Sequence, residues 1–310
     1  MRGIIRILTS SVLFACGATS CFTGIESTPK ISDKNLDRER IVVTDEEKYL
    51  TDIMPEQPGD WKEGKLFYVT DSRINLALEP SPHPSPKAGE YLAYKGRRGV
   101  PSLTGSLDTE IILSDSHGNE FVHRINTSPE ELDSRDKIEI PFAIEMSMVD
   151  RTKQELNGKK LYIRTSLWFD NEGNAVRGLK YIPVEVTDVQ PGNTIYPVKV
   201  KFISADNPEA GEAYVYLMVG NALKGARNFA SLFYFDDPRK RYPQITDENW
   251  KAITHSRVAP YMTREECRLA LGNPSSIDRY HGTTTYSERW NYENGISLIF
   301  DDGILRNFRK

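Results

Sequence analysis

The feature that most constrains this chain is a series of short segments between residues 61 and 220 in which apolar and polar residues alternate. Successive side chains of a strand point to opposite faces, so this alternation is typical of half-buried β-strands. The segments are Leu66–Thr70, Glu110–Leu113, Phe121–Ile125, Lys137–Phe142, Leu161–Thr165, Tyr181–Val186, Pro197–Ile203 and Tyr214–Val219. Many short strands separated by Gly, Asn, Asp and Pro predict a mainly β fold made of small sandwiches or barrels.

This region also has the signs of an internal duplication. Gly64–Val69 aligns with Gly158–Ile163, and a strand–turn–strand pattern follows each of them. The repeat predicts two β modules, at residues 61–135 and 136–225. Sheets of this kind are similar to bacterial SH3-like barrels, so a duplicated SH3-like fold is the architecture that we expect here.

Two capped helices are predicted near the carboxyl end. Thr246 precedes an amphipathic run and is placed as its N-cap. Thr263 and Glu266 have the spacing of a capping box, in which each side chain satisfies a backbone N–H of the first turn. Gly272 supplies the left-handed conformation that ends the second helix.

A β-meander is predicted to follow these helices. Its three strands are expected at Glu288–Tyr292, Ile296–Phe300 and Ile304–Phe308. A three-residue turn with Gly295 left-handed pairs Trp290 with Leu298, and we prefer it because it collects the apolar side chains on one face. The side chains on that face are Trp290, Tyr292, Ile296, Leu298 and Phe300. The two helices are available to cover it, which predicts a two-layer α+β domain at residues 226–310.

This carboxyl-terminal pattern resembles a known family. Met262–Pro274, then Glu288–Gly295, then Leu298–Gly303 are similar to the SmpA/OmlA family of small outer-membrane lipoproteins, the BamE-like domain. The shared pattern is a capped helix with Met-Thr at its start and Leu-Gly-x-Pro at its end, a Trp-x-Tyr strand and a Phe-Asp-Asp-Gly turn. The resemblance implies a role in the outer membrane.

The amino-terminal residues have the layout of an export signal. Residues 1–20 begin with positive charge, continue with a short apolar run and end in small residues. Because Cys21 follows directly, the segment resembles a bacterial lipoprotein signal, which implies a covalent lipid on Cys21; Cys16 is the alternative position. Residues 21–60 are then expected to form a polar tether and a short helix that begins at the Thr44 capping box.

Composition excludes several classes of function. With 40 basic and 44 acidic residues the formal charge is -4, which provides no electrostatic footprint for nucleic acid. Three cysteines, two of them near the amino terminus, exclude a disulfide scaffold.

The sequence contains no pattern that predicts a catalytic, metal-binding or phosphate-binding site. Cys267 occupies a helix position where a small buried hydrophobe is expected, and the histidines lack metal spacing. Gly59–Lys65 matches most of a phosphate-binding loop, but Leu66 stands where Ser or Thr must reach Mg²⁺. Lys95–Arg98 and Arg239–Arg241 are interpreted as solvated loop charges. We therefore expect no catalytic residue, no metal site and no cofactor apart from the lipid.

Together these patterns predict a lipid-anchored cell-envelope protein that acts as a non-catalytic scaffold, in the outer membrane and facing the periplasm, with the cell surface as the alternative. Its partners would be the membrane and envelope proteins or the cell wall. The expected interaction surface is Arg289, Trp290, Tyr292, Arg306 and Phe308, on the last strands of the meander. The alternatives are a peptidoglycan-binding lipoprotein and a protein inhibitor of a secreted enzyme; an enzyme is the remaining rival.

Overall fold

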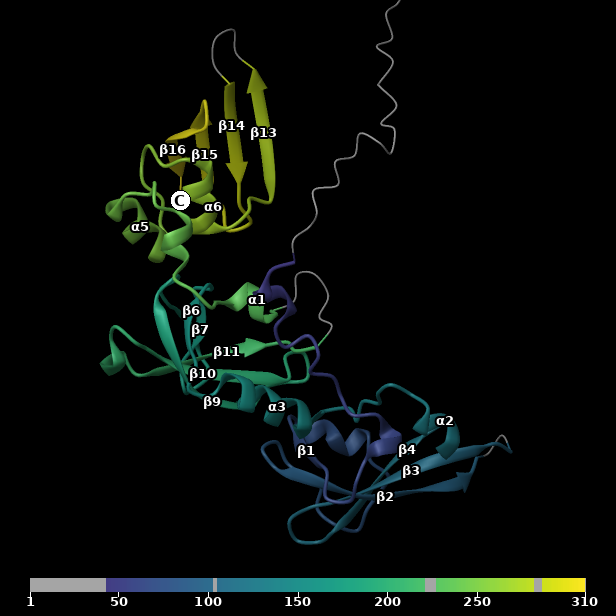
Figure 1. The fold of residues 1–310 in the computed structure, drawn as a ribbon. Helices are drawn as coiled ribbons and strands as arrows, with labels where there is room; N and C mark the ends of the chain where they lie inside the picture. The colour runs from purple at the N-terminus through teal and green to yellow at the C-terminus, as the bar shows by residue number, and fades with distance from the viewer. Residues whose placement is uncertain (1–42, 103–104, 221–226, 282–285, 310) are drawn as a thin grey trace, which may run out of the picture. The chain divides into compact units, whose positions relative to one another are not determined.

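The computed structural model describes residues 43–102, 105–220, 227–281 and 286–309. These residues form a mainly β structure with three antiparallel sheets and a smaller helical part (Figure 1). The predicted signal segment, Cys16, Cys21 and most of the tether lie outside the described residues. Within the described part, no helix is both long and apolar enough to cross a membrane.

The first sheet has the strand order β4-β3-β2-β1-β5. Its strands are β1 (Leu66–Val69), β2 (Tyr91–Pro101), β3 (Leu107–Ser114), β4 (Glu120–Ile125) and β5 (Ala143–Glu145). The alternation along these strands directs Phe67, Leu92 and Ile111 into one buried core. Helix α2 (Pro129–Asp133) adds Leu132 to this core, and the hydroxyl of Ser128 caps it.

Two strands of this sheet differ from the prediction. Strand β2 was not predicted, and it contains Lys95–Arg98, which was interpreted as a loop. The other difference is in the last strand. Residues 137–140 of the expected strand have no regular structure, and the strand is β5. β5 pairs with β1, so the first sheet extends past residue 135, where the sequence placed the boundary of the first module. Pro141 lacks a backbone N–H, and Phe142 has a φ of 64°. The chain therefore changes direction at these two residues, and the alternating pattern before them is not part of the sheet.

The second sheet has the order β12-β6-β9-β10-β11-β7-β8. Its strands are β6 (Lys160–Ile163), β7 (Leu167–Phe169), β8 (Ala175–Arg177), β9 (Pro183–Pro191), β10 (Val198–Ser204), β11 (Glu212–Leu217) and β12 (Phe233–Tyr234). Helix α3 (Met146–Leu156) packs against β9, and helix α4 (Phe229–Leu232) directly precedes β12. Helix α1 (Asp45–Lys48) contacts α4 and begins at the predicted Thr44 capping box.

The first two sheets have the same order of strands through the part in which their strands correspond. In each, a first strand (β1 or β6) pairs on one side with the first of three successive meander strands, and the other two follow it outward in the sheet. A short helix then leads to a last strand, β5 or β12, which pairs on the other side of the first strand. The hairpin β7–β8 is an addition in the second sheet. Because β12 lies after residue 225, the second sheet also extends into the range that the sequence assigned to the carboxyl-terminal domain.

The third sheet has four strands, where the sequence predicted three. Its order is β13-β14-β15-β16, with β13 (Ser276–His281), β14 (Tyr286–Asn291), β15 (Ser297–Asp301) and β16 (Ile304–Arg309). Strand β13 was missed because, of its described side chains, only Ile277 packs against the core. An edge strand with mainly polar residues does not show the alternation by which strands are recognised.

The helices of this part agree with the prediction. Helix α5 (Asp247–Thr254) is capped by Thr246, and helix α6 (Arg264–Leu271) has the complete capping box of Thr263 and Glu266. Gly272 ends α6 with a φ of 87°.

The predicted turn between β14 and β15 is also confirmed. Trp290 pairs with Leu298, the backbone N–H of Tyr292 donates to the carbonyl of Ile296, and Gly295 has a φ of 83°. Trp290, Leu298 and Phe300 are fully buried in the core below helices α5 and α6. Register was predictable here because a one-residue shift would exchange the two faces of the strand.

We expect Trp290→Ala to lower the free energy of unfolding by about 3 to 5 kcal/mol, the usual range for removing a large aromatic side chain from a core. The indole is fully buried, contacts the ring of Phe300 and donates from Nε1 to the buried carboxylate of Glu288. Urea unfolding measures the effect. The neighbouring Arg289 is exposed, so Arg289→Ala should change stability by less than about 0.5 kcal/mol. Equal effects of the two substitutions would contradict the assigned faces.

Candidate functional site

The predicted interaction surface is divided between the two faces of the third sheet. Arg289 and Arg306 are exposed, as a docking surface requires. Trp290 is fully buried, while Tyr292 and Phe308 are half-buried and pack against the same core. The prediction was therefore wrong for Trp290, because the alternation that collects these side chains on one face directs that face toward α5 and α6. For Tyr292 and Phe308 it stays a prediction.

Cys267 has the environment of a core residue. Its side chain is fully buried, and burial followed by the nearby charge of Glu266 raises the pKa of its thiol to about 12. A protonated, inaccessible thiol is a poor nucleophile. Among the described residues, no group of three or more His, Cys, Asp or Glu side chains could hold a metal ion.

The basic clusters visible in the sequence are paired with carboxylates from distant segments. Lys95 pairs with Glu63 at 2.6 Å, and Arg97 with Asp133 at 2.6 Å. The other pairs are Arg98 with Glu110, Arg239 with Asp247 and Arg241 with Glu46. These clusters therefore present less uncompensated positive charge than their sequences suggest.

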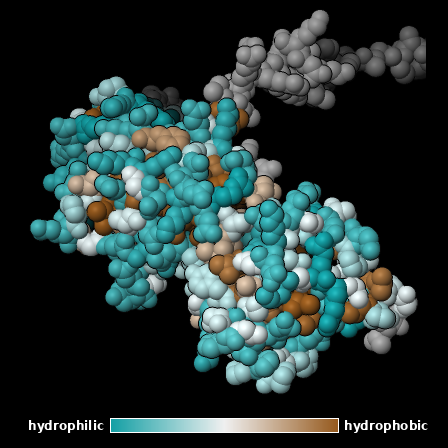
Figure 2. All heavy atoms as spheres, turned by 60° about the horizontal axis from the view of Figure 1, so that its bottom comes forward, coloured by the Kyte–Doolittle hydropathy of each residue, from teal (hydrophilic) through white to brown (hydrophobic). Residues whose placement is uncertain are grey.

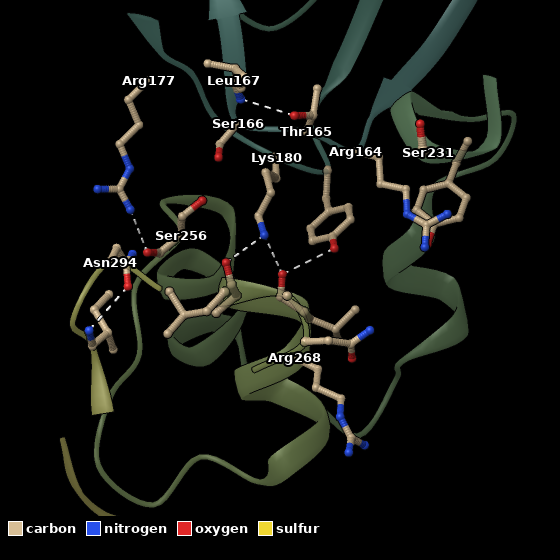
Figure 3. Close-up of a pocket in the computed structure, with 18 of the residues that line it drawn as sticks. Arg164, Thr165, Ser166, Leu167, Arg177, Lys180, Ser231, Ser256, Arg268 and Asn294 are labelled. Atoms are coloured by element: carbon tan, nitrogen blue, oxygen red, sulfur yellow. Dashed lines mark hydrogen bonds between the residues drawn. The ribbon is translucent and has the colours of Figure 1, made fainter. Parts of the chain in front are cut away.

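A different group of basic residues surrounds a cavity of about 990 Å³. One wall is formed by residues 164–181, which include the hairpin β7–β8, and the other by the carboxyl-terminal end of α6 (Figure 3). Residues 294–296, from the β14–β15 turn, contribute at one side. Four cations line this cavity, and Glu265 is the one carboxylate among its described lining residues: the cations are Arg164, Arg177, Lys180 and Arg268. We call these four residues the cationic group.

The first wall is held in place by close packing. Gly178 lies so near Trp168 that a Cβ there would be 2.0 Å from the indole ring, so no other residue fits without a shift. Its backbone N–H donates to the carbonyl of Ser166, and the backbone N–H of Lys180 donates to that of Thr254. These contacts position Arg177 and Lys180, on either side of Gly178–Leu179, at the cavity.

Lys180 is the buried member of the cationic group. Its ammonium donates to the carbonyl oxygens of Leu269 and Ala270, each at 2.6 Å, as Figure 3 shows. These carbonyls belong to the last turn of α6, where helix carbonyls have no partner within the helix and the helix dipole favours a cation. Tyr181 donates from its hydroxyl to the same Leu269 carbonyl at 3.2 Å.

The other three cations are held by neutral groups. Arg164 donates to the carbonyl of Ala230, and its guanidinium lies 4.7 Å from the centre of the Tyr234 ring. The guanidinium of Arg268 lies 4.7 Å from the Trp290 ring. None of the four cations forms an ion pair with a carboxylate in the described part of the chain. In a chain with a formal charge of -4, this local excess of positive charge is the clearest electrostatic feature.

This environment lowers the pKa of Lys180. Burial, and then the charges of Arg164 and Arg177, lower the pKa of its ammonium from 10.5 to about 8. Both neighbours are thus close enough to affect it electrostatically.

Sequence reasoning did not select any member of the cationic group. The four residues are separated by up to about a hundred positions, and none belongs to a basic run. No local pattern could have identified them, because the tertiary fold alone brings residues 164–180 to helix α6.

We expect the stability of the protein to rise with pH between about 8 and 10.5 by a contribution that Lys180→Met removes. In this interval the unfolded chain, with a lysine pKa near 10.5, binds more protons than the folded protein, with a pKa near 8. The contribution should be on the order of 1 kcal/mol per pH unit in urea unfolding experiments.

Lys240 is an exposed lysine and provides the control. Lys240→Met should retain the pH dependence of the unchanged protein. If the unchanged protein and Lys180→Met gave parallel stability curves over this interval, the assigned environment of Lys180 would be wrong.

The face of the molecule that Figure 2 shows is mainly hydrophilic, with hydrophobic atoms in small groups. Comparison of the chain with family models, with curated proteins and with solved structures finds no match in any of the three. The function of this chain is therefore argued from its own residues.

Proposed function

We propose that the protein is lipid-anchored at Cys21 and acts as a non-catalytic interaction module of the cell envelope, in outer-membrane assembly or maintenance. The observation that carries this proposal is the position of Cys21, directly after a charged start, a short apolar run and small residues. The described fold begins at the Thr44 cap, so residues 22–43 separate the lipid from the first helix. A polar segment of this length could extend to about 70 Å.

The resemblance to the SmpA/OmlA family supports the outer-membrane part of the proposal. The residues that carry it form three consecutive features of the structure: the capped helix α6, the strand β14 and the turn between β15 and β16. We propose that this part docks a protein partner on the face of the third sheet opposite α5 and α6. Arg289 and Arg306 are exposed and suit an acidic partner surface.

The second candidate function is binding of peptidoglycan. It is favoured by the strand path that the first two sheets share, since a five-stranded path in which the last strand returns to the first is what a duplicated SH3-like module would have. We treat this as the alternative because it does not account for the third sheet. Pelleting of the purified protein with insoluble peptidoglycan distinguishes it from docking to a protein.

We expect radiolabelled palmitate to be incorporated into the unchanged protein and into Cys16→Ala, but not into Cys21→Ala. The thioether on Cys21 is the attachment point in this proposal, and lipid chains supply about 0.8 kcal/mol of membrane affinity per buried methylene. Cys21→Ala should therefore also move to the soluble fraction. Equal labelling of Cys21→Ala and the unchanged protein would refute anchoring at Cys21.

We expect the double variant Arg289→Glu with Arg306→Glu to lose the envelope proteins that cross-link to the unchanged protein. Reversing two exposed charges opposes an acidic partner without changing the core. Lys240→Glu reverses one exposed charge on the short helix Pro238–Arg241 and should retain the same partners. An unchanged set of cross-linked proteins in the double variant would exclude this face, while leaving the lipid anchor unaffected.

A further inference from the structure

Ser256 is the residue at the cavity whose side chain the fold leaves unsatisfied. It lines the cavity and is 6% exposed, and its Oγ has no hydrogen-bond partner among the described residues. A buried hydroxyl without a partner costs about 1 to 3 kcal/mol, so such groups are few in folded proteins. The cavity side on which Ser256 lies also carries Arg177 and Lys180 (Figure 3).

Ser256 has a backbone conformation in which a side chain is unusual. Helix α5 ends in a Schellman motif, in which the N–H of Ser256 donates to the carbonyl of Ile253 and the N–H of Arg257 to that of Ala252. Ser256 occupies the left-handed position of this motif with a φ of 52°, where glycine is the usual residue. A serine is thus present at a position where the backbone conformation alone would favour glycine.

Arg177, Lys180 and Arg164, which line the same cavity, have hydrogen-bond donors that the fold does not use. Arg177 uses its Nη2 to donate to the carbonyl of Ser256 at 2.9 Å, and a guanidinium has five N–H groups. Lys180 has three N–H groups, and its two hydrogen bonds to helix α6 leave one. Arg164 likewise uses one of its donors, toward the carbonyl of Ala230. A ligand at this point would meet donors and positive charge.

We propose that the cavity binds a phosphate ester, whose phosphate oxygens accept hydrogen bonds from Ser256 Oγ, Lys180 and Arg177. Guanidinium groups match phosphate geometry, and a phosphate monoester presents three terminal oxygens and a charge of about -1.5 to -2 to the cationic group, more than one carboxylate does. The volume of about 990 Å³ is within the range of small-molecule sites and leaves room for the organic part of the ester. Arg164 and Arg268 add positive charge along the cavity wall.

This proposal is independent of the lipid anchor and of the docking face. It concerns other residues, and it can be tested whether or not the protein is anchored to a membrane. The phosphate group could belong to a soluble ester or to a lipid headgroup, so two probes with the same phosphate monoester are needed. Glycerol phosphate in solution is one, and phosphatidylcholine vesicles that contain phosphatidic acid are the other.

The decisive variant is Ser256→Gly in the full chain that also carries Cys21→Ala, so that no lipid anchor contributes. Its binding is measured by titration calorimetry and by flotation with vesicles that contain or lack phosphatidic acid. Glycine relieves the left-handed strain, so thermal stability should be equal or higher. Affinity for the phosphate probe should fall at least about tenfold, since hydrogen bonds to charged groups contribute about 1.5 to 3 kcal/mol. Arg177→Gln should weaken binding similarly, and Lys240→Gln, on the exposed short helix Pro238–Arg241 outside the cavity lining, should not.

The two probes identify the source of the phosphate. Binding of glycerol phosphate that Ser256→Gly weakens supports a soluble ester, and binding of phosphatidic acid vesicles alone, with the same loss, supports a lipid headgroup. The proposal is overturned if neither probe binds, if Ser256→Gly and Lys240→Gln behave alike, or if citrate binds as tightly as glycerol phosphate.

Discussion

The interaction on which the candidate site depends is the hydrogen bonding of the Lys180 ammonium to the end of helix α6. The carbonyls of Leu269 and Ala270 lack partners within the helix, and the helix dipole favours positive charge at this end. Burial opposes the charged form, as the lowered pKa of Lys180 records. The lysine therefore links the second sheet to the helical layer of the third, and the cavity lies between the two surfaces that it joins.

The cations of the two basic runs differ from those of the cavity, because carboxylates neutralise the former and not the latter. The arginines of the two basic runs in the sequence meet carboxylates such as Asp133, Glu110 and Glu46. Such pairs near the surface contribute little to stability, but they reduce the positive potential around strand β2 and the short helix Pro238–Arg241. The cationic group has neutral partners instead, the carbonyls and aromatic rings of its neighbours. It therefore retains its positive potential, and the unpartnered hydroxyl of Ser256 lies beside it.

Expectations based on local interactions agreed with the structure. The Thr263 capping box and the turn at Gly295 depend on residues a few positions apart, and both were predicted in detail. Strands such as β2, β5 and β13 were missed because strand pairing depends on distant partners. For Trp290 the pattern identified the face correctly, but its assignment to a docking surface was wrong, because the same face packs against helices α5 and α6.

The sequence by itself determined the mainly β character of the chain, the two capped helices and the register of the β14–β15 hairpin, and it predicts the lipid on Cys21. Each of these depends on alternation, on capping distances or on a linear signal. Tertiary structure alone decided which strands close the first two sheets, which cations remain without carboxylates and that Ser256 joins Arg177 and Lys180 at one cavity. The reason is physical: burial and electrostatic potential depend on neighbours in space, and those neighbours come from segments far apart in the chain.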